Sequence, residues 1–126
     1  MKEYIVNVYD DGDKYWYLNG RLHREDGPAY ECADGDKYWY LNGKYHRDDG
    51  PAIEHANGSK KWYLNGQLHR EDGPAIEWTS GSKEWWLNGQ ELSEEEFNRR
   101  TQTTEVTLDE IAEKFGIDVS QLKIKK

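Results

Sequence analysis

The sequence predicts a mainly β protein: an antiparallel β-hairpin repeat array of about four 23-residue units with a small C-terminal α-helical cap. The first observation is a tryptophan at every 23rd position, at Trp16, Trp39, Trp62 and Trp85. The second is an Asn-Gly pair that begins three residues after each tryptophan. The third is the loss of the period after Gly89, where helix-capping sequences begin. Such a period indicates stacked copies of one supersecondary unit. We therefore predict the array over residues 1–90 and the cap over 91–126.

Each unit carries two strand-like runs. Aromatic residues dominate one run, at 14–18, 37–41 and 61–64, and the other run follows Gly-Pro, at 28–32, 51–55 and 74–78. Both compositions favour a pleated, half-buried strand. Asn-Gly tolerates positive φ at both positions and predicts a type I′ hairpin turn. Asp11-Gly12, Asp34-Gly35 and Asn57-Gly58 predict a second turn in each unit.

The predicted register follows from a two-residue turn at Asp34-Gly35. This turn would place Tyr30 opposite Trp39 and Glu31 opposite Tyr38. Period-2 alternation would then gather Trp, Leu and Ile on one face of the sheet. The other face would carry tyrosines edged by glutamates. The same register places Asn7 opposite Trp16, so we expect the first hairpin to fray.

The cap is predicted from two capping boxes. Ser93-Glu94-Glu95-Glu96 begins a helix over about 94–101, and Leu92 is placed to pack against Phe97. Thr107-Leu108-Asp109-Glu110 begins a second helix that Gly116 ends, and residues 122–124 predict a short closing strand. Residues 107–122 resemble parts of a LysM glycan-binding module and of a helix-turn-helix, both incomplete, so we favour a role in covering the sheet.

Composition limits the classes of partner. The 126 residues carry a net charge of −8 with acidic and basic residues interleaved, which disfavours direct binding to nucleic acid or anionic lipid. No apolar run approaches the ~20 residues of a membrane span. One cysteine excludes an intrachain disulfide, and the N-terminus lacks a signal-peptide pattern. We therefore expect a cytoplasmic protein.

The repeat resembles the MORN family. Tyr17-Leu18-Asn19-Gly20-Arg21-Leu22-His23 and its copies carry the likeness, over roughly residues 4–90. The chain departs after the histidine, because His-Arg-(Glu/Asp)-Asp-Gly-Pro replaces His-Gly-x-Gly and is one residue longer. The resemblance implies a meandering antiparallel sheet that serves as a scaffold or binding surface and performs no chemistry. Small proteins of this repeat style also resemble bacteriophage products, and this resemblance implies a location in the cytoplasm of a bacterial host cell.

The repeated histidines are the most obvious candidate site. His23, His46 and His69 would stand ~9–10 Å apart, two strands per unit, which is too far for one shared metal ion. We predict that each histidine is hydrogen-bonded within its own turn. No nucleophile stands in a pattern with a base and an orienting group. We therefore expect no enzyme activity, no metal and no cofactor.

The aromatic face is the remaining candidate, because one sheet face should stay uncovered by the cap. The predicted partner-binding residues are Tyr15, Tyr17, Tyr38, Tyr40, Tyr63, Trp86, Glu31, Glu54 and Glu77. We predict a non-catalytic protein-binding module whose partner has a basic surface, in its sharpest form a phage-type inhibitor of a host nucleoprotein or defence enzyme. Alternatives are a small-ligand or glycan binder with stacked aromatics, and a nucleic-acid-associated regulator acting through residues 107–126. A homodimer is a further alternative that the sequence does not exclude.

Overall fold

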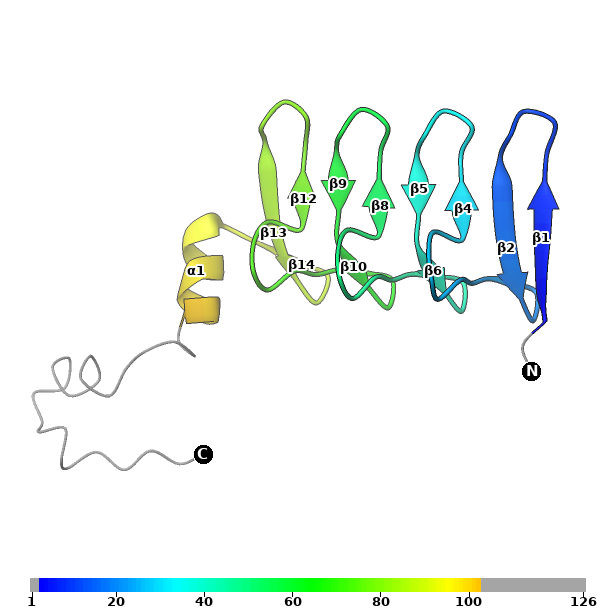
Figure 1. The fold of residues 1–126 in the computed structure, drawn as a ribbon. Coiled ribbons are helices and arrows are strands. Elements are labelled where there is room, and N and C mark those ends of the chain that lie inside the picture. The colour runs from blue at the N-terminus through cyan, green and yellow to red at the C-terminus, as the bar shows by residue number, and fades with distance from the viewer. Residues whose placement is uncertain (1–2, 103–126) are drawn as a thin grey trace, which may run out of the picture.

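The computed structural model describes residues 3–102, a mainly β chain with one short C-terminal helix. Tall hairpins stand side by side, shorter hairpins lie beneath them, and the helix closes one end (Figure 1). The strands are β1 (Tyr4–Val8), β2 (Lys14–Leu18), β3 (Arg21–Leu22), β4 (Tyr30–Glu31), β5 (Lys37–Tyr38), β6 (Tyr40–Leu41), β7 (Lys44–Tyr45), β8 (Ile53–Glu54), β9 (Lys60–Lys61), β10 (Tyr63–Leu64), β11 (Gln67–Leu68), β12 (Ile76–Glu77), β13 (Lys83–Leu87) and β14 (Gln90–Leu92). The helix is α1 (Glu94–Gln102).

The tall hairpins form one antiparallel meander. Its strand order is β1-β2-β4-β5-β8-β9-β12-β13-β14, and β3 pairs with β2 off this path. The lower hairpins β6–β7 and β10–β11 form separate two-stranded sheets. Each repeat therefore contributes two strands to the tall sheet and one lower hairpin, which confirms the predicted fold class.

The Asn-Gly turns take the predicted conformation. Asn42 has φ 53° and Gly43 has φ 79°, and the other three pairs differ from these values by only a few degrees. Leu41 pairs with Lys44 across the turn, so two residues form the loop. Positive φ at both central positions defines a type I′ turn, which explains why Asn and Gly recur there.

The second turn differs from the prediction, and it shifts the register by one residue. The Gly35 N–H donates to the Cys32 carbonyl (3.0 Å) and the Cys32 N–H donates to the Asp36 carbonyl (2.8 Å). The loop therefore holds three residues, 33–35, with Gly35 at φ 104°. Three-residue hairpin loops take glycine at this left-handed position.

The corrected register exchanges the two faces. Tyr30 lies opposite Tyr38 rather than Trp39, and Glu31 lies opposite Lys37 rather than Tyr38. Because side chains alternate along a strand, a slip of one residue moves every partner to the other face. The first hairpin has the same loop, so Val6 and not Asn7 lies opposite Trp16. The predicted polar mismatch at that end is therefore wrong.

The long aromatic run bends at its tryptophan. The Trp39 N–H donates to the Ala52 carbonyl (2.7 Å), and the Trp39 carbonyl accepts from the His46 N–H (3.0 Å). One peptide group thus pairs with the tall sheet and the next pairs with the lower hairpin. This change of partner splits the predicted 37–41 strand into β5 and β6.

The helix forms where the first capping box predicts it. The Glu96 N–H donates to Ser93 Oγ (3.1 Å), as expected of an N-cap. α1 packs against β13 and β14, and its Phe97 is only 4% exposed. The second helix and the closing strand, predicted within 107–126, lie outside the described residues.

The interior is thin. Within residues 3–102, the buried apolar side chains are three alanines, two isoleucines and one phenylalanine: Ala29, Ala52, Ala75, Ile53, Ile76 and Phe97. Most tryptophans and tyrosines of the array are half-buried, whereas Tyr4, Tyr9 and Trp78 are exposed. Across residues 3–102, no helix combines the length and apolarity needed to cross a membrane.

Candidate functional site

One face of the array carries a continuous stack of tyrosines. Tyr15 stacks on Tyr30 with ring centroids 4.2 Å apart, and Tyr30 stacks on Tyr38 at 5.1 Å. Beyond Tyr38 the rings are tilted rather than stacked, with Tyr38 6.2 Å from Tyr45 and Tyr45 5.0 Å from Tyr63. We call this set the tyrosine ladder, which consists of Tyr15, Tyr17, Tyr30, Tyr38, Tyr40, Tyr45 and Tyr63.

The structure thus brings together all five tyrosines predicted from the sequence. It adds Tyr30, which the wrong register had moved to the other face, and Tyr45. In the units before and after, the position of Tyr45 is a leucine, so this residue had no periodic signal. Trp86 takes the equivalent slot in the last unit, and its Nε1–H donates to Glu84 (3.2 Å).

Four of the ladder hydroxyls, those of Tyr30, Tyr38, Tyr40 and Tyr63, lie in surroundings that favour the neutral phenol. Burial raises the pKa of Tyr38 to about 12. Burial also raises the pKa of Tyr40 and of Tyr63, while the pKa of Tyr30 is raised mainly by its bond with Cys32. All the ladder rings are half-buried and in contact with other rings. The ladder therefore resembles an aromatic core more than a freely exposed surface.

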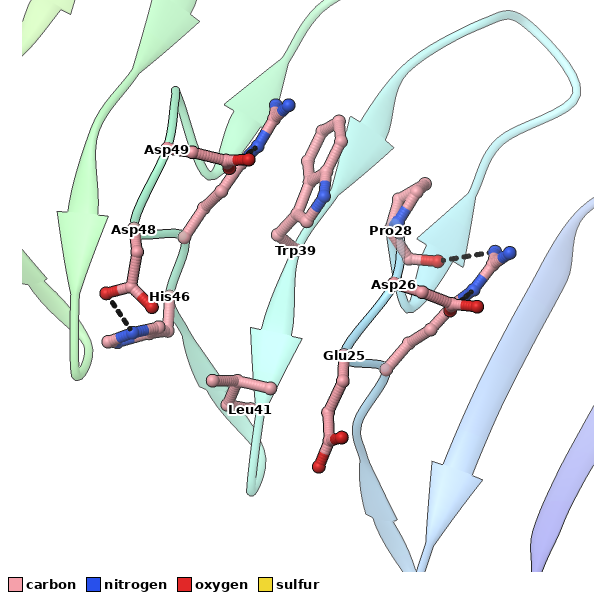
Figure 2. A pocket seen from close by; sticks show the side chains of 11 residues that line it. Glu25, Asp26, Pro28, Trp39, Leu41, His46, Asp48 and Asp49 are labelled. Carbon is pink, nitrogen blue, oxygen red and sulfur yellow. Dashed lines mark hydrogen bonds and ion pairs between the residues drawn. The ribbon is translucent and has the colours of Figure 1, made fainter.

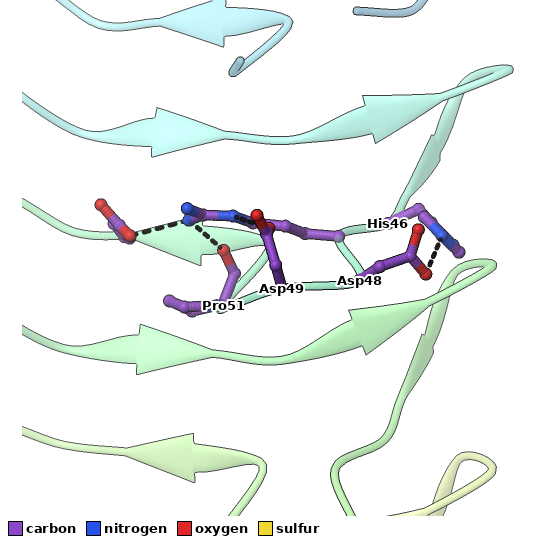
Figure 3. A network of polar contacts seen from close by, with 6 residues as sticks. His46, Asp48, Asp49 and Pro51 are labelled. Carbon is purple, nitrogen blue, oxygen red and sulfur yellow. Dashed lines mark hydrogen bonds and ion pairs between the residues drawn. The ribbon is translucent and has the colours of Figure 1, made fainter. Parts of the chain in front are cut away.

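The opposite face is built from arginines stacked on tryptophans. The guanidinium carbon of Arg47 lies 3.9 Å from the centroid of the Trp39 ring. Arg47 also donates from Nε to Asp49 (3.1 Å), and from Nη1 to the Pro51 carbonyl (3.0 Å) and to Glu54 (2.9 Å) (Figure 3). Such a stack orients the arginine and contributes ~1 kcal/mol. These contacts hold the whole 46–52 loop against the sheet.

The cluster recurs at one-repeat intervals. Arg24 stacks on Trp16 at 4.0 Å and Arg70 on Trp62 at 3.8 Å. Each arginine bonds to the aspartate two residues later and to the proline carbonyl four residues later. In the repeated His-Arg-(Glu/Asp)-Asp-Gly-Pro phrase, the arginine and the aspartate thus have structural partners.

The three predicted glutamates lie on this tryptophan face and not beside the tyrosines. Glu54 and Glu77 accept from the Nη1 of Arg47 and Arg70, both at 2.9 Å. Glu31 lies opposite Lys14 and Lys37 in the sheet register. The reason is the corrected register, which gives the glutamates the parity of the tryptophans. The structure therefore separates the tyrosines from the acid that was expected to edge them.

The histidines join each unit to the next one. The Asn42 N–H donates to Nδ1 of His23 (2.9 Å), and the same bond links Asn65 to His46 and Asn88 to His69. Because Nδ1 accepts, the neutral ring carries its hydrogen on Nε2, which faces Glu25 or Asp48 within its own turn. The prediction of a bond within the turn is confirmed for these two, and the link between units is new.

A second link lies at the upper loops. Asp13 Oδ1 accepts from the Ala33 N–H (2.7 Å), and Asp36 Oδ1 accepts from the Ala56 N–H (2.6 Å). This backbone bond holds the pKa of Asp36 below its ordinary value. Ser59 Oγ plays the same part for Thr79 at 3.2 Å. Each unit is therefore tied to its neighbour at both ends of its tall hairpin.

Successive loops enclose grooves on the tryptophan face. One groove of about 530 Å³ has Trp39 and Leu41 between the 24–28 loop and the 46–49 loop (Figure 2). A second groove of about 620 Å³ repeats it one unit later around Trp62 and Leu64. Their rims carry acidic side chains, which we call the loop carboxylates: Glu25, Asp26, Asp48, Asp49, Glu71 and Asp72.

The loop carboxylates are the exposed acid of this face. Asp26, Asp49 and Asp72 have 86–87% of their side chains exposed, and Asp48 has 82%. Glu54 is only 36% exposed. Within residues 3–102, no cluster of three or more His, Cys, Asp or Glu side chains could hold a metal ion. The tryptophan face therefore carries successive grooves, each with exposed acidic side chains at its rim and a tryptophan and a leucine at its base.

Comparison with protein families, curated proteins and solved structures finds no match to this chain.

Proposed function

We propose that this chain is a non-catalytic protein-binding module whose partner presents a basic, extended segment to the tryptophan face. One observation carries the proposal: exposed loop carboxylates border successive grooves at the spacing of the repeat. Acid rims over partly apolar floors suit lysine or arginine side chains, whose stems are apolar and whose ends are charged.

The loop carboxylates are already positioned for such a partner. Asp49 is held by Arg47 and Asp48 by His46, yet both remain more than four-fifths exposed. Binding would therefore order few additional side chains, which lowers its entropic cost. Glu54, which lies within the sheet, already has basic neighbours, because it lies opposite Lys37 and Lys60.

The repeat spacing suggests the form of the partner. Neighbouring units are two strands apart, ~9–10 Å. A segment in the extended polyproline II conformation advances ~3.1 Å per residue with three residues per turn, so every third side chain points the same way at a spacing of ~9 Å. A segment with a basic residue at every third position would therefore meet one groove per basic residue. Nucleoproteins and defence enzymes that bind nucleic acid present basic segments. In its most specific form, the proposal is that this chain inhibits such a protein inside a bacterial cell.

Within this proposal, the tyrosine ladder stabilises the array and does not bind the partner. Tyr30 lies between Tyr15 and Tyr38, so its ring faces are already covered by other rings. A sugar or a nucleotide base needs an open ring face for stacking. The ladder therefore gives no specific support to glycan or small-ligand binding.

The test compares two variants with equal charge. Asp26→Asn, Asp49→Asn and Asp72→Asn together remove three loop charges, and each amide oxygen can still accept from its arginine. Glu91→Gln, Glu94→Gln and Glu95→Gln remove three exposed charges outside the grooves. Both changes take the net charge from −8 to −5. The probe is a fluorescent peptide with lysine at every third position, titrated at two salt concentrations.

We expect the loop variant to bind the peptide at least about tenfold more weakly than the native chain, with a flatter salt dependence. The control variant should bind within about twofold of the native chain, since only long-range attraction changes. Equal weakening by both variants would mean that net charge alone attracts the peptide. Equal binding by all three proteins would reject the tryptophan face as the binding surface.

A further inference from the structure

The first strand of the array has an unusual composition for a sheet edge. In β1 and the residue after it, exposed apolar side chains follow one another: Tyr4 37%, Ile5 63%, Val6 44%, Val8 63% and Tyr9 53%. They account for five of the six large hydrophobic residues that are exposed within residues 3–102. Edge strands are usually protected by charge, proline or a bulge. The run Tyr4–Val8 carries no charged residue and no proline.

The backbone of this edge is also open. Within residues 3–102, β1 pairs with β2 alone and stands at the end of the strand order. The Tyr9 N–H donates to the Asp13 carbonyl, so residues 9, 7 and 5 direct their peptide groups toward β2. By alternation, Tyr4, Val6 and Val8 direct their N–H and C=O groups away from the sheet. A further antiparallel strand could pair with all three.

The other end of the array is closed in a different way. β14 is followed after one residue by α1, which packs against β13 and β14 and buries Phe97. A head-to-tail contact between copies would have to displace this helix. A head-to-head contact between two β1 edges needs no such change, and it is closed by two-fold symmetry.

We propose that two copies of this chain associate through β1, antiparallel and centred on Val6. Val6 would then pair with the partner's Val6, and Tyr4 with the partner's Val8. The three outward-facing residues of each strand would exchange backbone hydrogen bonds, joining two tall sheets into one.

Side chains support the same register. Tyr4, Val6 and Val8 share the face of Trp16, because Val6 lies opposite Trp16. A groove of about 350 Å³ opens directly beside this edge, with Tyr4, Val6 and Trp16 on its apolar side and Arg24, Glu25 and Asp26 on its charged side. Two-fold pairing would place a second Val6 and a second Trp16 across the axis. Apolar side chains would thus continue from one copy into the other.

Charge distinguishes this contact from partner binding. Each chain carries a net charge of −8, so two chains repel each other, whereas the paired strands are uncharged. Added salt screens that repulsion, so dimerisation should strengthen with salt. Binding of a basic segment to the loop carboxylates should weaken with salt, and the two contacts are therefore separable in one titration.

The test exploits the two-fold axis. Val6→Lys or Val6→Glu places like charges opposite each other in a homodimer, whereas an equal mixture of the two variants places lysine opposite glutamate. Val6→Thr is the uncharged control, which keeps a β-branched side chain. The full chain and each variant are examined by analytical ultracentrifugation over a range of concentrations, with circular dichroism as the check of folding.

We expect the native chain and Val6→Thr to dimerise, each charged variant to raise the dimer dissociation constant by about tenfold or more, and the mixture to recover the dimer. A native chain that sediments as a monomer at every concentration would overturn the proposal. So would charged variants that dimerise like the native chain. If lysine at position 6 prevents folding, Val8→Lys is mixed with Tyr4→Glu, which places lysine opposite glutamate only in the mixed dimer; the mixture should then dimerise more tightly than either variant alone, and equal dimerisation would overturn the register.

Discussion

At the scale of single residues, a stacked arginine explains the most repeated phrase of the chain. Arg47 lies on Trp39 and binds Asp49, Pro51 and Glu54 at once. Its guanidinium leaves almost no room beside residue 50, where a Cβ would lie 3.0 Å from Arg47 Cζ. Glycine at that position therefore serves close packing rather than a left-handed backbone.

Gly50→Ala tests this packing. The added methyl group should displace Arg47 from Trp39 and lower the free energy of unfolding by about 1–2 kcal/mol, as overpacking does. Urea denaturation followed by tryptophan fluorescence measures the change. In an Arg47→Met background the same substitution should cost much less, because the flexible thioether can yield. An equal cost in both backgrounds would trace the effect to the backbone instead.

At the scale of elements, hairpin loops decide which side chains form the tyrosine ladder. The three-residue loop ending at Gly35 places Tyr30 opposite Tyr38, and the β2–β4 register places Tyr30 opposite Tyr15. Both contacts are stacked pairs. Aromatic pairs of this kind contribute ~0.5–1.5 kcal/mol beyond burial. The ladder therefore joins neighbouring strands across unit boundaries.

The ladder predicts a loss of stability in alkaline solution. Burial raises the pKa of Tyr38 from 10.0 to about 12, so the folded state favours the neutral phenol. The stability that the neutral Tyr38 phenol contributes is fully present below pH 10, where the phenol is neutral in both the folded and the unfolded state. It is lost as the pH rises toward 12, because the unfolded state ionises first. Denaturation midpoints measured across this range should decline, and Tyr38→Phe should reduce the decline. An unchanged slope in Tyr38→Phe would contradict the shift.

At the scale of the whole molecule, the array is held by contacts between nearest neighbours. Each junction repeats the histidine bond, such as Asn42 to His23, and the upper-loop bond, such as Ala33 to Asp13. Stability should then be a sum over units and junctions. Within residues 3–102, every strand pairing joins strands of the same unit or of adjacent units, so one unit can be removed without isolating another.

Deletion of residues 35–57 tests this additivity. Removing 23 residues leaves an equivalent junction between the first and third units, so the shortened chain should fold with a lower melting temperature and a smaller denaturant m-value. Deletion of residues 35–56 leaves the junction one residue out of phase and should prevent cooperative folding. Similar melting of both deletions would contradict a repeat-registered array.

Local signals in the sequence were sufficient for the repeat, the type I′ turns and the start of α1. Asn42-Gly43 requires positive φ wherever it forms a tight turn, and Ser93 caps a helix through its own short-range bond. These features depend on residues within one turn of each other. Periodicity then extended them to the whole array, because every unit carries the same local chemistry.

Pairing across the sheet was decided only in three dimensions. Asp34-Gly35 is compatible with a loop of two or of three residues. The loop length decides on which face of the sheet Tyr30, Glu31 and Glu54 lie relative to the tryptophans. The three-residue loop is accompanied by contacts between units, including the Tyr15–Tyr30 stack and the Asp36–Ala56 bond. Residues 15 to 20 positions apart form these contacts, and no local pattern records them. The exposed acid of the tryptophan face therefore lies on the loops, because chain packing and not sequence spacing determines which charges stay exposed.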